Sequence, residues 1–127
     1  MNLLLDTHVF LWWDDQARVL NANARAVVAD PTNQVFISAV SIWEIAIKRR
    51  LKKLRFRGSL VAAIAANGFH ELPVLPIDGE HAGDLAWQHN DPFDRMLVAQ
   101  ARRQGFTLVT ADTAIRAYAH VAQIWAG

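Results

Sequence analysis

Four acidic residues stand where short apolar runs end or where helices are expected to begin: Asp6, Glu44, Asp94 and Asp112. If they converge in one cleft, each pair of charges about 4 Å apart repels by roughly 4 kcal/mol at an effective dielectric of about 20. Such repulsion requires protonation or a bound cation. Because all four offer oxygen, we expect Mg²⁺ or Mn²⁺. Such a site can activate a water for in-line attack on a phosphodiester.

Three of these acids also have a simpler structural explanation. Asp6 can cap the turn that follows it, and Asp112 can be the N-cap of a helix over 113–119. Glu44 can pair with Lys48 one helical turn later. The residues taken singly leave both explanations open.

The stretch HNDPFDRMLVAQA, residues 89 to 101, contains two aspartates three positions apart. Asp91 precedes Pro92, and proline favours the first position of a helix, so Asp91 is predicted as the helix cap. Asp94 then falls at the third helical position, near the positive end of the helix dipole. Capping accounts for Asp91 but only partly for Asp94, which we assign to the metal.

The elements that must position these residues follow from the hydrophobic pattern. Extended segments are predicted at 2–5, 35–38, 71–78, 107–110 and 121–125, and helices at 21–30, from Ser38 or Ser41 to about 54, and at 59–67, 79–88, 92–104 and 113–119. Short apolar strands that alternate with helices indicate a mostly parallel sheet of about five strands, covered on both faces. Ligands of such sheets bind beyond the carboxyl ends of the strands, where these acids lie.

The helix after residue 38 has a regular apolar pattern at Val40, Trp43, Ile47, Leu51 and Leu54. This period predicts an apolar stripe that faces the core. For the five tryptophans of the chain, we expect packing in the core or in a dimer rather than stacking on bases.

Basic residues are concentrated in one segment. Positions 48–57 hold seven of the thirteen Lys and Arg residues, and the rest of the chain has six basic against twelve acidic residues. Lysine and arginine neutralise phosphates. We therefore expect contacts with RNA or with a protein inhibitor at Lys48, Arg49, Lys52, Lys53 and Arg55, although a solvated helix face is the simpler explanation of such a run.

Composition limits the remaining possibilities. The length of 127 residues predicts one domain, 1–127, and the absence of cysteine excludes disulfides and thiolate sites. No apolar run reaches the ~18 residues of a membrane span, and the first run makes a poor signal peptide. We expect a cytoplasmic protein without membrane contact.

Three segments together resemble a known family: LLLDTHVFLWW, then VFISAVSIWEIAIKRRLKKL, then HNDPFDRMLVAQARRQGFTLVTAD. The chain resembles the PIN-domain ribonucleases, specifically the VapC-like toxins of bacterial toxin–antitoxin pairs, from residue 2 to about residue 125. The resemblance implies a three-layer α/β/α fold with a mostly parallel central sheet. It also implies a metal-dependent endoribonuclease that acts as the toxin of a toxin–antitoxin pair.

The resemblance carries over to individual residues. Asp6, Glu44, Asp94 and Asp112 match the family's four acids, which implies that they bind Mg²⁺ or Mn²⁺ and the water that attacks RNA. Thr7 and Thr110 match small polar positions beside the site. The implied partners are an RNA substrate, a cognate antitoxin and a second copy of the chain in a homodimer.

The same residues bear on three other functions. A haloacid-dehalogenase-like phosphohydrolase needs Asp-x-Asp after the first strand, where this chain has Asp6-Thr7-His8. A histidine acid–base ribonuclease needs a histidine pair, and His8 and His89 flank the acids as conceivable substrate contacts. A non-catalytic RNA-binding module using 48–57 stays open, although four clustered acids would oppose binding of a polyanion.

Overall fold

The computed structural model describes all residues, 1–127, and its centre is a five-stranded sheet. The strands are β1 (Asn2–Leu5), β2 (Gln34–Ser38), β3 (His70–Leu72), β4 (Thr107–Thr110) and β5 (Gln123–Trp125). Their order across the sheet is β3-β2-β1-β4-β5, and every neighbouring pair is parallel. The predicted fold, a mostly parallel sheet of about five short strands, is confirmed.

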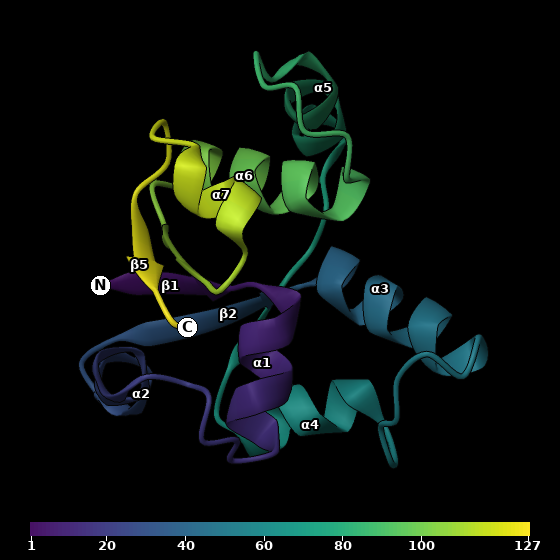
Figure 1. Cartoon of the computed structure of the whole chain (residues 1–127), viewed down its shortest axis with the longest axis vertical. Coiled ribbons are helices and arrows are strands. Elements are labelled where there is room, and N and C mark those ends of the chain that lie inside the picture. The colour runs from purple at the N-terminus through teal and green to yellow at the C-terminus, as the bar shows by residue number, and fades with distance from the viewer.

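Seven helices cover the sheet and connect its strands (Figure 1). They are α1 (Thr7–Asp14), α2 (Ala22–Ala29), α3 (Ala39–Arg50), α4 (Leu60–Ala66), α5 (Pro76–Asp84), α6 (Pro92–Gln104) and α7 (Thr113–Ala117). Figure 1 shows α1, α2 and α4 on one side of the sheet and α5, α6 and α7 on the other. None of these helices has both the length and the apolar character that crossing a membrane would require.

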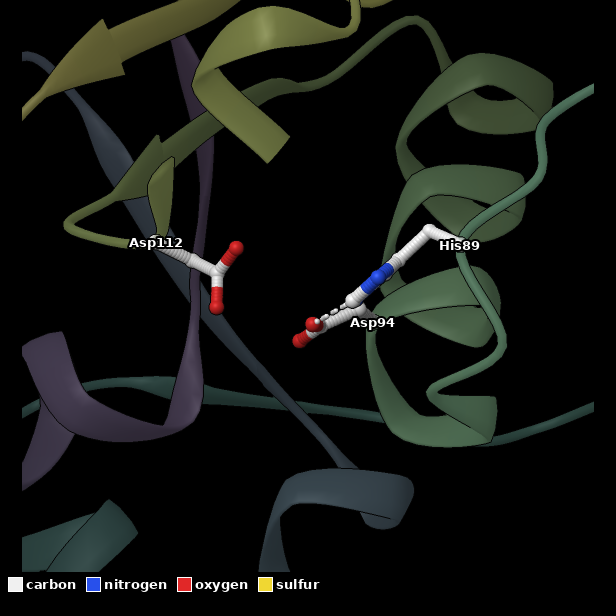
Figure 2. Close-up of side chains that lie close together, drawn as sticks. All are labelled: His89, Asp94 and Asp112. Carbon is white, nitrogen blue, oxygen red and sulfur yellow. Dashed lines mark hydrogen bonds and ion pairs between the residues drawn. The ribbon is translucent and has the colours of Figure 1, made fainter. Parts of the chain in front are cut away.

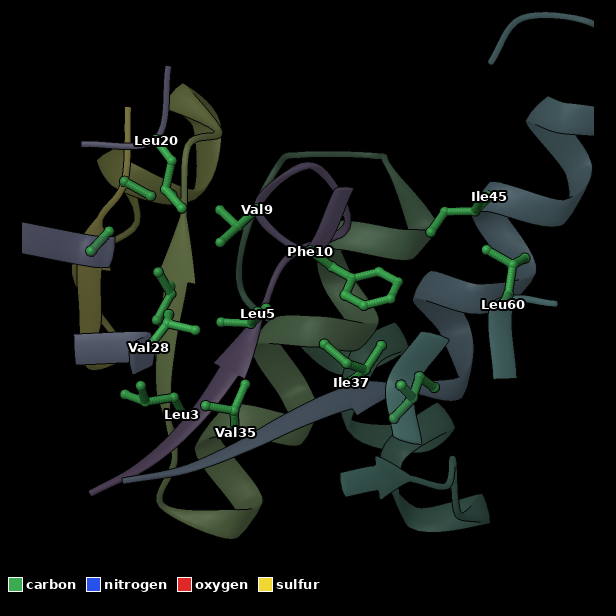
Figure 3. Packing of buried hydrophobic residues seen from close by; sticks show 14 residues of the cluster. Leu3, Leu5, Val9, Phe10, Leu20, Val28, Val35, Ile37, Ile45 and Leu60 are labelled. Carbon is green, nitrogen blue, oxygen red and sulfur yellow. The ribbon is translucent and has the colours of Figure 1, made fainter. Parts of the chain in front are cut away.

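Two apolar cores lie on the two faces of the sheet because successive side chains of a strand point to opposite faces. On β1, Leu3 and Leu5 join one core and Leu4 joins the other. The first core packs the sheet against α1, α2 and α4, with Phe10 as its largest fully buried side chain (Figure 3). The second packs it against α6 and α7. The central strand β1 is thus buried on both faces, as its NLLL sequence predicts.

Local signals place most helix ends. Asn21, Ser38 and Ser59 cap α2, α3 and α4 by accepting a hydrogen bond from a backbone N–H in the first turn. Gly105 ends α6 at a φ of 68°, a left-handed conformation that glycine adopts without strain. Of the two candidates for the N-cap of α3, Ser38 and Ser41, the cap is Ser38, and the helix begins at Ala39.

Around residues 70–88 the predicted boundaries are wrong. The third strand covers only His70–Leu72, and the helix expected at 79–88 begins at Pro76 and ends at Asp84. The helix begins nearer the N-terminus than predicted because Pro76 suits the first helical position. The Asp78 carboxylate accepts a hydrogen bond from the Leu75 N–H and pairs with Arg103, which fixes this start against α6.

The predicted apolar stripe of α3 is wrong at Trp43 and Leu51, although Val40 is buried as predicted. Trp43 and Leu51 are 62% and 58% exposed, whereas the buried residues of this helix are Val40, Ser41, Glu44 and Ile45. The helix spans the two layers at the end of the sheet, and Val40 and Ile45 join different cores. A polar side chain pair, Ser41 and Glu44, therefore occupies the inward face where apolar residues were expected.

Candidate active site

The acids lie at the carboxyl ends of the two central strands. Asp6 directly follows β1, and Asp112 comes two residues after β4, the strand that pairs with β1. From β1 the chain continues to β2 on one side and later returns to β4 on the other, so the strand order reverses between β1 and β4. Open parallel sheets bind ligands at such a point.

Asp6 is a buried carboxylate with both oxygens engaged. Oδ1 accepts a hydrogen bond from the Val9 N–H at 2.9 Å, which makes Asp6 the cap of α1. Oδ2 accepts from the Thr110 hydroxyl and from the Ala111 N–H. Burial raises the pKa of Asp6, and these hydrogen bonds oppose the rise. Asp6 thereby joins β1 to the segment that carries Asp112.

Glu44 is buried on the inner face of α3, and its two oxygens also have partners. The Thr7 hydroxyl donates to Oε1 at 2.7 Å and lies 3.1 Å from the Ser41 hydroxyl oxygen. Lys48 donates to Oε2 at 2.7 Å. Because Thr7 directly follows Asp6, this hydrogen bond ties Glu44 to the end of β1.

Asp94 and Asp112 face the same space, together with His89 (Figure 2). One oxygen from each carboxylate and a ring nitrogen of His89 all lie within 4.8 Å of one another. His89 Nε2 is 2.7 Å from Asp94 Oδ2. The pKa of Asp94 is raised to about 7: burial is the largest cause, the charges of Asp112 and Asp91 add to the rise, and the His89 hydrogen bond opposes it.

Asp112 caps α7 while it faces this space. Its Oδ1 accepts hydrogen bonds from the Ala114 and Ile115 N–H groups, and its own N–H donates to the Thr110 hydroxyl. Thr110 therefore bridges Asp6 and Asp112. The two explanations offered for the acids are compatible, since Asp6, Glu44 and Asp112 have the expected structural contacts and still lie at the same end of the sheet.

Asp91 is the N-cap residue of α6, and its Oδ1 accepts from the Phe93 and Asp94 N–H groups. We expect Asp91→Asn to keep near-normal stability and much of any activity, since asparagine caps equally well. Asp91→Ala should cost about 1 kcal/mol of unfolding free energy. Urea unfolding of the two variants measures this difference, and loss of stability in the asparagine variant would contradict the assignment of Asp91 as a cap.

His89 joins the site, where the sequence indicated no more than a conceivable substrate contact. It precedes α6 in a segment without regular structure, 85–91. Arg95, the residue after Asp94, organises this segment: its guanidinium donates five hydrogen bonds to the carbonyl oxygens of Ala82, Gly83, Leu85, Trp87 and His89. A guanidinium has five N–H donors, so all of them are used. The advance signal was the position of His89 next to the acids in the sequence.

The donor set fits a hard divalent cation. Asp94 and Asp112 are two carboxylates close enough to share one ion. Burial, together with the neighbouring charges of Asp112 and Asp91, raises the pKa of Asp94, and a bound cation would oppose that rise. Carboxylates suit Mg²⁺ and Mn²⁺, whereas the imidazole of His89 suits softer metals. Because His89 already bonds to Asp94, it serves best as an orienting partner of that carboxylate.

The basic segment begins on the last turn of α3 and continues into the following loop. Two of its residues are engaged within the chain: Lys48 pairs with Glu44, and Arg49 donates to the Gly58 carbonyl at 3.0 Å. Several others are exposed, namely Arg50, Lys52, Lys53, Arg55 and Arg57. The predicted contacts of Lys48 and Arg49 with a partner would have to compete with these internal bonds.

The fold and the site define a class: a parallel α/β domain with clustered carboxylates at the carboxyl ends of its central strands. Comparison with known proteins identifies the family within this class. The chain belongs to the PIN domain family, which it matches over residues 3–121. The resemblance inferred from the sequence is therefore confirmed.

Individual relatives agree with this assignment. Ribonuclease VapC22 of Mycobacterium tuberculosis is 25% identical over 121 residues, which cover 93% of this chain and 92% of the relative. Among solved structures, VapBC2 from Rickettsia felis bound to a promoter DNA fragment contains a chain of the same fold, with a TM-score of 0.68, 12% identity and full coverage of both chains. A toxin–antitoxin complex from Klebsiella pneumoniae gives a TM-score of 0.62 at 18% identity, with 87% of each chain covered.

Proposed function

We propose that this protein is a metal-dependent endoribonuclease that acts as the toxin of a toxin–antitoxin pair. The observation that carries the proposal is the placement of Asp94 and Asp112, with His89, at the carboxyl end of the central strands of a PIN domain. VapC22, a relative over nearly the whole chain, is named a ribonuclease. The catalytic and metal-binding residues proposed are Asp6, Glu44, Asp94 and Asp112.

The geometry suggests a division of roles among these acids. Asp94 and Asp112 would hold Mg²⁺ or Mn²⁺, since each leaves an oxygen without a hydrogen bond to the chain. When bound, the cation would lower the pKa of a water and stabilise the leaving oxygen. Asp6 fixes the backbone at Ala111, next to Asp112. Glu44, held by Thr7, would meet the cation or the water from the α3 side.

We also propose the partners of this site. An RNA phosphate backbone suits the exposed basic residues of the segment 48–57. A cognate antitoxin is supported by the toxin–antitoxin complex among the structural relatives. A homodimer, a cytoplasmic location and a single-domain chain are further proposals, and the last is supported by cores that draw on residues from Leu3 to Ala126.

The test is RNA cleavage by the purified chain with Mg²⁺, with Mn²⁺ and with excess EDTA. We expect cleavage with either cation, none with EDTA, and recovery when the cation is restored. The Asp91→Asn variant, purified in parallel, serves as a matched control because it removes the charge of the acid that caps the same helix and keeps its hydrogen bonds to the backbone. Cleavage that persists in EDTA would overturn the proposed metal dependence. RNA binding without cleavage in any cation would favour the non-catalytic RNA-binding module.

A further inference from the structure

Trp43 is the one tryptophan of the chain that lies mostly in solvent. It is 62% exposed on α3, whereas Trp12, Trp13, Trp87 and Trp125 are all partly buried. A large aromatic side chain that stays in water gains nothing from burial on folding, and tryptophan is enriched where proteins bind partners. Of the packing expected for the tryptophans, in the core or in a dimer, packing in the core is therefore wrong for Trp43, and packing in a dimer stays a prediction.

Trp43 lies beside the proposed active site. Its ring packs edge-on against the Phe93 ring of α6, with 5.5 Å between the ring centroids. Trp43 directly precedes Glu44, and Phe93 directly precedes Asp94. Two aromatic residues on two helices thus adjoin two of the site acids, and Phe93 supports the Trp43 ring from one side.

The surroundings of Trp43 are basic along the same helix. Arg50 follows two turns later, at a spacing that places it on the same face. Beyond it the exposed lysines and arginines of 52–57 continue. A partner that covers Trp43 and extends along α3 meets Arg50 and then the basic loop that follows the helix, which suits a polyanion with flat apolar groups better than an apolar protein surface.

We propose that Trp43, supported by Phe93, stacks on an unpaired base of the RNA substrate next to the scissile phosphate. The inference rests on the proposed function, because it needs RNA at the site. Proteins that recognise single-stranded RNA stack splayed bases on aromatic side chains and bind the backbone with basic residues. Trp43 would then position the strand while the acids act on the phosphate.

The experiment measures binding of a fluorescein-labelled random-sequence RNA of about 12 nucleotides, a length within the site sizes of single-strand binding domains. The Asp94→Asn background and Mg²⁺ are used so that the RNA is bound and not cut. Trp43→Leu keeps an apolar side chain without the ring, and Trp43→Phe keeps a smaller ring. Val19→Ala, at an exposed apolar residue outside the site, is the matched control.

We expect Trp43→Leu to raise the Kd about 5- to 50-fold and Trp43→Phe to restore most of the affinity. The slope of log Kd against log salt should stay unchanged in both, since stacking releases no counterions. Val19→Ala should bind like the parent. Circular dichroism melts should show that Trp43→Leu stays folded, as expected for an exposed position.

Other outcomes separate the two proposals. If Trp43→Leu leaves the Kd unchanged and the chain that retains Asp94 still cleaves RNA, the stacking role alone is overturned. Lack of both RNA binding and cleavage in the unsubstituted chain overturns the proposed function and the stacking role together. A Kd that rises only because Trp43→Leu turns a dimer into a monomer in sedimentation would assign this face to a second copy.

Discussion

Asp94→Asn should reduce metal-dependent RNA cleavage by about 1,000-fold while the protein stays folded. The side chain keeps its shape and a hydrogen-bond partner for His89 but loses its negative charge. One attraction between unit charges about 4 Å apart is worth roughly 4 kcal/mol at an effective dielectric near 20, which corresponds to about three powers of ten in rate. Initial rates with Mg²⁺ and far-ultraviolet circular dichroism measure the two parts of this expectation.

The same substitution should raise the free energy of unfolding of the metal-free protein at neutral and higher pH. The folded-state pKa of Asp94 is raised to about 7, so the native state loses stability as the pH rises from about 4 towards 7, and this loss persists at higher pH. Asparagine does not titrate. At pH 8 in EDTA, Asp94→Asn should therefore unfold at a higher urea concentration than the parent chain.

With a divalent cation present, the parent chain should instead be more stable than Asp94→Asn. Added Mg²⁺ or Mn²⁺ should stabilise the parent chain, because an ion that binds only the native state shifts unfolding by mass action, and it should stabilise Asp94→Asn much less. This comparison requires no RNA. Equal stabilisation of both proteins would show that Asp94 does not hold the cation, whatever the cleavage assays show.

Arg95→Met should destabilise the protein by about 3 kcal/mol and should also lower activity. Methionine keeps the apolar stem but leaves five backbone carbonyls of residues 82–89 without their donor. Hydrogen bonds to a charged group contribute about 1.5–3 kcal/mol each, and the freed carbonyls recover part of this from water. Urea unfolding of the variant gives the loss.

The activity loss of Arg95→Met has a separate cause. The segment that Arg95 binds carries His89, which orients Asp94, so its release removes a partner of the proposed metal ligand. Arg102→Met is the matched control on α6, since Arg102 makes one side-chain hydrogen bond, to Tyr118. We expect Arg102→Met to lose no more than about 1 kcal/mol. Equal losses in the two variants would show that the five carbonyl contacts add nothing.

The sequence by itself determined the features that depend on neighbours along the chain. Strand β1, the Asp91 cap and the Gly105 stop follow from apolar runs and from capping residues, whose effects act within one helical turn. The positions of Asp6 and Asp112 at strand ends followed too, because the ends of parallel strands meet at one edge of the sheet.

Only the tertiary structure decided how distant segments meet. The 3.6-residue period showed which residues of α3 share a face. Both layers of helices contact α3, and their positions decide that Glu44 is buried and Trp43 exposed. His89 contacts Asp94 from a segment that Arg95 holds in place through hydrogen bonds to its carbonyl oxygens. No periodic pattern in the sequence predicts which carbonyls accept those bonds. Side-chain hydrogen bonds depend on three-dimensional approach, whereas strands and caps depend on local sequence.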